Sequence, residues 1–180
     1  MVESRDFALV ERCRRGDRQA FEALIREYQR PVYNVACRIL GNPDDAADAT
    51  QAAFLKAFEN LDRYDPDYKF FSWIYRIAIN ESINLRKRTR ELRLLDENQP
   101  AAGAGPDSTV EAGDLAHSIQ DGLMALTDDY RTVLVLRHFS DLSYRQISEV
   151  LGISEKTVKS RLYSARQLMR DQLIANGIEL

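Results

Sequence analysis

The sequence is poor in the residues that build metal centres, disulfides and catalytic sites. Its two cysteines, Cys13 and Cys37, form no CxxC pair and have no histidine near them. Its two histidines, His117 and His138, lie far apart, and neither is spaced from a cysteine, serine or carboxylate as catalysis would need. A glycine-rich phosphate loop is also absent. We therefore expect no metal site, no cofactor and no catalytic residues, so the protein is not expected to be an enzyme.

Long apolar runs and strand patterns are missing as well. No apolar run approaches the roughly 20 residues that cross a bilayer. The opening stretch, MVESRDFALVERCRRG, has a charged helical pattern where a secretory signal would have an apolar core. The β-branched alternation of strands does not occur, whereas apolar residues recur at helical spacing. These features predict an all-α protein that is cytoplasmic and does not insert into a membrane.

Proline and glycine gather in one stretch and divide the chain. Residues 92–113 lose helical periodicity and contain Pro100, Gly103, Gly105, Pro106 and Gly113. We expect an exposed, flexible linker there, between a four-helix domain at 1–91 and a second helical domain at 114–180. The helices are expected at 4–15, 17–40, 44–61, 70–91, 116–125 and 128–139, followed by two more near the C-terminus.

Those last two helices have the pattern of a helix-turn-helix. Ser143 and Gln146 have the spacing of a capping box, and Gly152 ends the first helix. Ser154 caps a second helix in which Val158 and Leu162 begin an apolar stripe. From Leu142 to Arg170 there are six Lys or Arg against two Glu, so this segment is positive inside a chain of net charge −3. A basic helix of this kind suits the DNA major groove, although an ordinary amphipathic hairpin could look similar.

A second candidate nucleic-acid surface precedes the linker. The loop at 62–69 leads into a helix that starts with Phe70, Phe71, Trp73 and Tyr75 and ends in a basic run. Aromatic side chains beside cations can hold unstacked single-stranded bases. The alternative is that these aromatic residues are simply core, and a basic run at a helix C-terminus is favoured by the helix dipole in any case.

The order of these segments resembles the extracytoplasmic-function sigma factors, a group of bacterial sigma-70 proteins. The residues that carry the resemblance are RGDRQAFEALIREYQRPVYNVACRILGN, DDAADATQAAFLKAFENLDRYD, FFSWIYRIAINESINLRKR and the segment LTDDYRTVLVLRHFSDLSYRQISEVLGISEKTVKSRLYSARQLMR. The resemblance implies a region 2 domain, a tether and a region 4 domain. It also implies a dissociable subunit of RNA polymerase, with core polymerase, promoter DNA and an anti-sigma factor as expected partners.

By the same resemblance, three sets of residues are expected to act. Core polymerase binding is expected from Asp48, Gln51, Phe54 and Leu55. Recognition of the −10 element is expected from Asp65, Tyr68, Lys69, Phe70, Asn80, Asn84, Arg86 and Arg88. Recognition of the −35 element is expected from Lys156, Lys159, Ser160, Arg161, Tyr163 and Arg166.

The sequence departs from the family where Ala47, Ala52 and Ala53 stand at or beside positions that usually carry a carboxylate, so polymerase affinity is expected to be altered. Ser164 also replaces a frequent arginine, which puts one promoter contact in doubt. The alternative function is a stand-alone helix-turn-helix regulator, which would usually bind a palindrome as a dimer.

Overall fold

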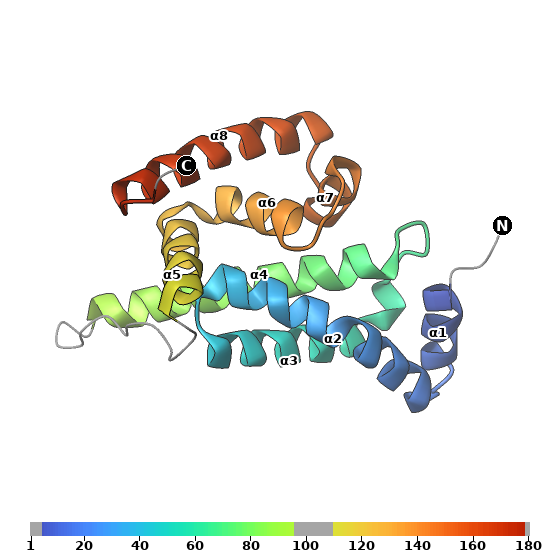
Figure 1. Ribbon diagram of the computed structural model, residues 1–180. Helices are drawn as coiled ribbons and strands as arrows, with labels where there is room; N and C mark the ends of the chain where they lie inside the picture. The colour runs from blue at the N-terminus through green and yellow to red at the C-terminus, as the bar shows by residue number, and fades with distance from the viewer. Residues whose placement is uncertain (1–4, 96–109, 179–180) are drawn as a thin grey trace.

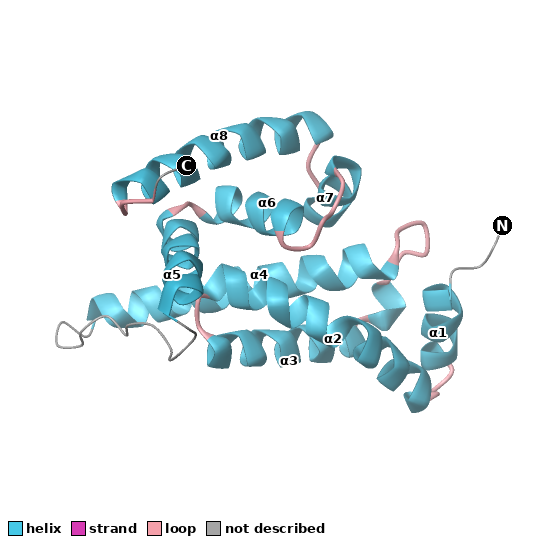
Figure 2. Ribbon diagram, in the orientation of Figure 1, coloured by secondary structure: helices cyan, strands magenta, loops and turns pink. Residues whose placement is uncertain are grey.

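The computed structural model describes residues 5–95 and 110–178, and every regular element within these two ranges is a helix (Figures 1 and 2). The first range, here the N-terminal unit, contains α1 (Arg5–Arg14), α2 (Arg18–Leu40), α3 (Pro43–Glu59), the short 3₁₀ helix η1 (Leu61–Arg63) and α4 (Phe70–Leu95). The second range, the C-terminal unit, contains α5 (Val110–Ala125), α6 (Asp128–His138), α7 (Tyr144–Leu151) and α8 (Glu155–Ala175). The all-α prediction is confirmed.

Local capping explains where the long helices of the N-terminal unit begin and end. The Asp17 carboxylate accepts hydrogen bonds from the backbone N–H groups of Gln19 and Ala20 at the start of α2. Gly41 ends this helix in the left-handed region, at φ 72°, which costs glycine little. Asn42 then caps α3 through its side chain, with Pro43 at the first helical position. Helix α2 continues through Pro31 without ending there, as the sequence predicted.

The predicted helix-turn-helix is confirmed by α7 and α8. The capping box at Ser143 and Gln146 is complete, because each side chain pairs with the other residue's backbone N–H. Gly152 closes α7 at φ 65°, and the Ser154 hydroxyl accepts from the Thr157 N–H at the start of α8. These caps set the sharp turn between α7 and α8, and α8 then packs against α6 and α7.

The two helices that flank the predicted linker extend a few residues into it. Helix α4 runs to Leu95 rather than stopping near Glu91, and α5 begins at Val110, so Gly113 lies inside a helix. The helical cost of one glycine, about 1 kcal/mol, does not stop a helix that neighbouring turns support. The remainder of the predicted linker, residues 96–109, lies outside the described residues.

The two units pack against each other and share one continuous cluster of buried side chains. In Figure 1, α6 and α7 lie between α8 and the layer that contains α2 and α4, while α3 lies on the far side of that layer. Helices α2 and α4 of the N-terminal unit contact α5, α6 and α7 of the C-terminal unit. The arrangement of the chain therefore places α8 on the outside, away from the three-helix layer of α2, α3 and α4.

Arg131 of α6 joins the two units from within this cluster. Its side chain is fully buried and donates to the carbonyl oxygens of Leu123, Met124 and Leu126 at the end of α5. It also donates to the Ile39 carbonyl of α2, over 3.2 Å. Burial lowers the pKa of Arg131 to about 10. The guanidinium thus caps two helices that belong to different units.

Candidate nucleic-acid interface

Helix α8 has one buried face and one exposed face. Val158, Leu162 and Ala165 are buried against α6 and α7. Lys156, Lys159, Ser160, Tyr163 and Arg166, all predicted from the sequence to contact the −35 element, are exposed. The Lys159 ammonium lies 5.8 Å from the centre of the Tyr144 ring on α7. The exposed face therefore presents cations, a hydroxyl and an aromatic ring on one rigid helix.

Arg161, the remaining predicted −35 residue, lies at the edge of that face. Its side chain is only 28% exposed, because it turns toward α6 and pairs with the Asp129 carboxylate over 2.7 Å. The ion pair would have to open before Arg161 could reach a DNA phosphate or base. No local sequence pattern indicates this contact, because Asp129 lies on α6 and Arg161 on α8, with α7 between them in the chain.

Arg166 contacts His138 at the end of α6. The Arg166 Nε donates to His138 Nε2 over 3.3 Å, which requires that ring nitrogen to be unprotonated. Burial lowers the pKa of His138, and the neighbouring charges of Arg166 and Arg137 lower it further. A neutral His138 therefore supports the outward position of Arg166.

The loop at 62–69 presents three of the predicted −10 residues to solvent. Asp65, Tyr68 and Lys69 are all exposed, and the side chain of Tyr68 is 52% accessible. The loop is anchored to the protein interior, because the hydroxyl of the buried Tyr64 donates to the Tyr68 carbonyl over 2.6 Å. Burial raises the pKa of Tyr64 to about 12, so this donor stays protonated. A short, braced loop thus carries an exposed aromatic ring beside a cation.

Phe70, also predicted to contact the −10 element, is buried in this structure. Its side chain is 1% exposed and packs against the rings of Tyr28, Tyr64 and Trp73, with centroid separations of 5.5, 5.8 and 5.7 Å. Trp73 is half-buried against the same rings, which favours the core interpretation for it. The aromatic cluster at the start of α4 therefore packs beneath the loop, and the Phe70 ring faces the protein interior.

Helix α4 continues the surface beyond the loop. Asn80, Asn84 and Arg88 follow one another at four-residue intervals and are all exposed, so they share one face of the helix. Arg86 is different, because its guanidinium pairs with the Asp128 carboxylate of α6 over 2.5 Å and is 28% exposed. Of the five predicted −10 residues on α4, three are thus accessible, Arg86 is paired with the C-terminal unit, and Phe70 is buried.

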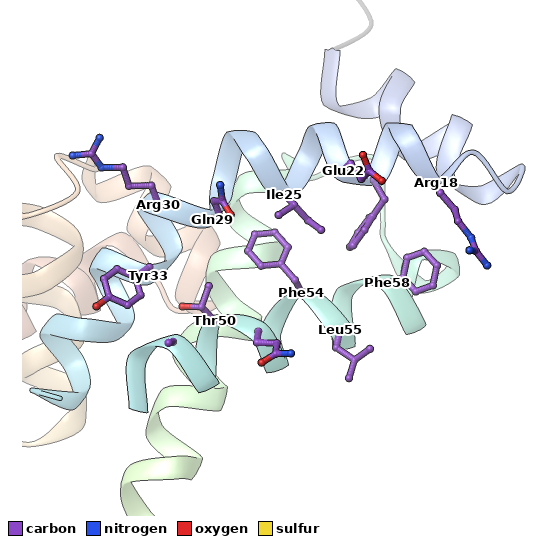
Figure 3. A pocket seen from close by; sticks show the side chains of 13 residues that line it. Arg18, Glu22, Ile25, Gln29, Arg30, Tyr33, Thr50, Phe54, Leu55 and Phe58 are labelled. Atoms are coloured by element: carbon purple, nitrogen blue, oxygen red, sulfur yellow. The ribbon is translucent and has the colours of Figure 1, made fainter. Parts of the chain in front are cut away.

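The predicted polymerase-binding residues border an apolar groove of about 840 Å³ between α2 and α3 (Figure 3). Phe54 is nearly buried, and Figure 3 shows its ring reaching toward Ile25 of α2. Gln51 and Leu55 also line the groove, and Leu55 is 57% exposed. Asp48 is exposed on the same helix but does not line the groove.

The sequence prediction missed most of this groove. Phe58, 48% exposed, follows Phe54 by four residues on α3, and this spacing could have indicated it. The opposite wall comes from α2, for which the sequence predicted no binding residue. Its lining residues are Arg18, Phe21, Glu22, Ile25, Gln29, Arg30 and Tyr33. Ala47, one of the positions where the family usually has a carboxylate, also lines this groove.

Other chemistry is not indicated by the described residues. Within residues 5–95 and 110–178, no three His, Cys, Asp or Glu side chains are grouped as metal ligands would be. Cys13 and Cys37 are free thiols, the first of them buried. None of the helices in these ranges is both long and apolar enough to span a bilayer.

The comparisons with known proteins match both units of the chain. The family model for Sigma-70 region 2 matches residues 24–91, and that for Sigma-70 region 4 matches residues 116–169. The ECF RNA polymerase sigma factor SigW of Bacillus subtilis is 34% identical over 176 residues, which cover 91% of this chain and 94% of that protein. The RNA polymerase sigma-H factor of Pseudomonas aeruginosa is 32% identical, over 93% of each chain.

Solved structures of similar fold agree with these matches. CnrH, solved in complex with the cytosolic domain of CnrY, has a TM-score of 0.74 and 27% identity, over 96% of this chain and 99% of its own. The sigma factor RpoE of Bartonella quintana, solved with the anti-sigma factor NepR, has a TM-score of 0.70 and 25% identity, over 85% of this chain and 96% of its own. The helix-turn-helix, together with the matches to sigma regions 2 and 4, defines a DNA-binding transcription protein. The chain belongs to the sigma-70 family, among the extracytoplasmic-function sigma factors.

Proposed function

We propose that this chain is a specificity subunit of RNA polymerase that directs initiation at promoters with defined −10 and −35 elements. The observation that carries the proposal is the exposed face of α8, where Lys156, Lys159, Ser160 and Tyr163 point outward from a helix whose other face is buried. Lysine can read guanine in the major groove, and serine can pair with several base edges. The −35 element is therefore read as duplex DNA by the C-terminal unit.

The N-terminal unit captures the −10 element after the strands separate. An exposed aromatic ring binds an unstacked base whatever its identity, at about 1–3 kcal/mol per base. Tyr68 supplies such a ring, and Lys69 beside it supplies a cation for the backbone. The exposed amides of Asn80 and Asn84 offer both donors and acceptors, so they can distinguish the edges of a flipped base.

Core polymerase binds the groove between α2 and α3. The groove is lined mainly by apolar and aromatic side chains, with Arg18, Glu22 and Arg30 among its polar residues. Burial of Phe58 and Leu55 by a partner helix removes two large exposed apolar side chains from water. Ala47 offers no charge there, so apolar contact has a larger share in polymerase binding than the family pattern would give it.

An anti-sigma factor and a cytoplasmic location are part of the same proposal. Two of the similar solved structures were determined in complexes with other proteins, one of them named as an anti-sigma factor. Core polymerase works in the cytoplasm, so a subunit that exchanges on it works there too. In this role the protein assists the polymerase's reaction.

Run-off transcription on a promoter library tests this proposal. Purified core polymerase is assayed with and without the chain, and we expect a sequence-defined set of transcripts only when the chain is present. The Tyr68→Ala variant should bind the same duplex −35 sequences but produce fewer transcripts. If no promoter responds to the chain, or if the free chain binds a palindrome and core polymerase has no effect, the stand-alone regulator is the better description.

A further inference from the structure

Two adjacent carboxylates at the start of α6 hold one predicted promoter-binding arginine from each unit. Asp128 accepts from Arg86 of α4 over 2.5 Å, and Asp129 accepts from Arg161 of α8 over 2.7 Å. Both arginines are 28% exposed, and the Asp128 side chain is 24% exposed. The Arg86–Asp128 pair is therefore better shielded from water than an ordinary surface ion pair, whereas the Arg161–Asp129 pair is shielded only on the arginine side.

Acidic residues in the first turn of a helix are common, because they interact favourably with the helix dipole. That explanation accounts for the two carboxylates but not for their partners. The partners come from two different helices, α4 and α8, and both were predicted from the sequence to contact DNA. A carboxylate offers an arginine the same paired oxygens as a phosphate does.

We propose that Asp128 and Asp129 form an internal latch that occupies Arg86 and Arg161 in the free chain and keeps both from DNA phosphates. This inference rests on the proposed function, and it adds a form of regulation to it. Promoter DNA and the carboxylates compete for the same two guanidinium groups. The free chain therefore meets DNA with two fewer cations than its sequence would suggest.

The geometry allows the latch to open without leaving a buried charge unpaired. Asp128 also accepts from the buried Arg131 over 3.3 Å, so it keeps a cationic partner when Arg86 leaves. Arg86 and Arg131 are like charges close to one another, and the departure of Arg86 relieves their repulsion. Asp129 has a side chain that is 65% exposed, so water can solvate it once Arg161 has turned away.

The Arg86 pair also links the latch to the arrangement of the two units. Arg76 of α4 donates to the carbonyl oxygens of Glu149 and Val150 at the end of α7, the second of these over 2.9 Å. Arg76 and Arg86 thus hold the C-terminal unit on α4 at two points. Separation of the units breaks the Arg86 contact, so whatever moves the C-terminal unit away from α4 releases Arg86 for DNA.

Salt dependence of DNA binding measures how many phosphates a protein contacts. One further phosphate contact steepens the slope of log Kd against log salt concentration by about 0.9. At ~0.15 M salt the same contact strengthens binding about fivefold. The probe is a short DNA duplex of mixed sequence, which reports phosphate contacts without knowledge of the promoter, and binding is followed by fluorescence anisotropy.

The variants are Asp128→Asn and Asp129→Asn in the full chain, with Asp121→Asn as the matched control. Asp121 is an exposed carboxylate on α5, so its replacement changes the net charge equally. We expect each latch variant to bind about fivefold more tightly with a slope steeper by about 0.9, and the control to keep the parent slope. Replacement of Arg86 by Gln in the Asp128→Asn background should remove the gain.

Slopes equal to that of the control in both latch variants would overturn the latch. Thermal melting by circular dichroism checks that the Asp128→Asn variant is folded. Asp129→Asn tests the idea independently, because Asp129, unlike Asp128, is not paired with the buried Arg131. Run-off transcription with the parent chain and core polymerase separates this inference from the proposed function. Normal transcription with unchanged slopes removes the latch alone, whereas absent transcription counts against the sigma-factor function itself.

Discussion

Replacement of Arg131 by Met should destabilise the whole fold. Its guanidinium is fully buried and donates to four carbonyl oxygens and to the Asp128 carboxylate. A methionine fills much of the same volume but leaves these acceptors without donors. Each buried unsatisfied group costs about 1–3 kcal/mol, although water and Arg86 can satisfy part of the set. We therefore expect a loss of about 3–5 kcal/mol, the usual cost of removing one partner from a buried charged network.

Guanidinium denaturation followed by far-UV circular dichroism measures this loss. Arg131→Lys should recover only part of it, because one ammonium cannot span the ends of α2 and α5 at once. The matched control is Arg26→Met on α2, where the side chain is 78% exposed and the expected change is under about 0.5 kcal/mol. A cost for Arg131→Met below about 1 kcal/mol would refute the idea that this residue joins the two units.

Three further predictions concern the functional surfaces. Lys159→Ala should cost about 1–3 kcal/mol in binding of the preferred −35 sequence and relax selection at one base, whereas a uniform loss over all sequences would show that Lys159 contacts only phosphate. Ala47→Glu should strengthen core polymerase binding about two- to fivefold in a competition assay, and Ala8→Glu on the exposed side of α1 should not. Because the pKa of His138 is lowered in the folded chain, the unfolded chain takes up that proton first. Stability should therefore fall as the pH drops below the ordinary value of 6.5, and His138→Gln should reduce this fall between pH ~7 and ~5 in urea titrations.

The features that the sequence predicted well are set by residues close to one another in the chain. Ser143, Gln146, Gly152 and Ser154 act within one or two turns, so the helix-turn-helix and its caps could be recognised without tertiary structure. The exposed face of α8 followed from the periodicity of its apolar residues. Local features of this kind depend little on how the helices pack against one another.

The features that the sequence did not predict depend on distant partners. Phe70 is buried because Tyr28 and Tyr64 lie against it, and no local pattern distinguishes it from an exposed aromatic residue such as Tyr68. Gly122 is similar, since a Cβ there would approach the Met169 sulfur to 2.8 Å, and its small size lets α5 approach α8. The occupation of Arg86 by Asp128 likewise requires the two units to be packed together.

In the proposed function, two separate surfaces of this chain act together on promoter DNA when polymerase holds them. One is the loop and α4 face of the N-terminal unit, and the other is the α8 face of the C-terminal unit. The most direct measurement compares the free chain with the chain bound to core polymerase on the same selected promoter, using gel shift for binding and permanganate reactivity for strand separation. We predict weak, sequence-independent binding without melting for the free chain, and strong, sequence-specific binding with melting around the −10 element once core polymerase is added. Tight specific binding by the free chain that core polymerase leaves unchanged would contradict this account.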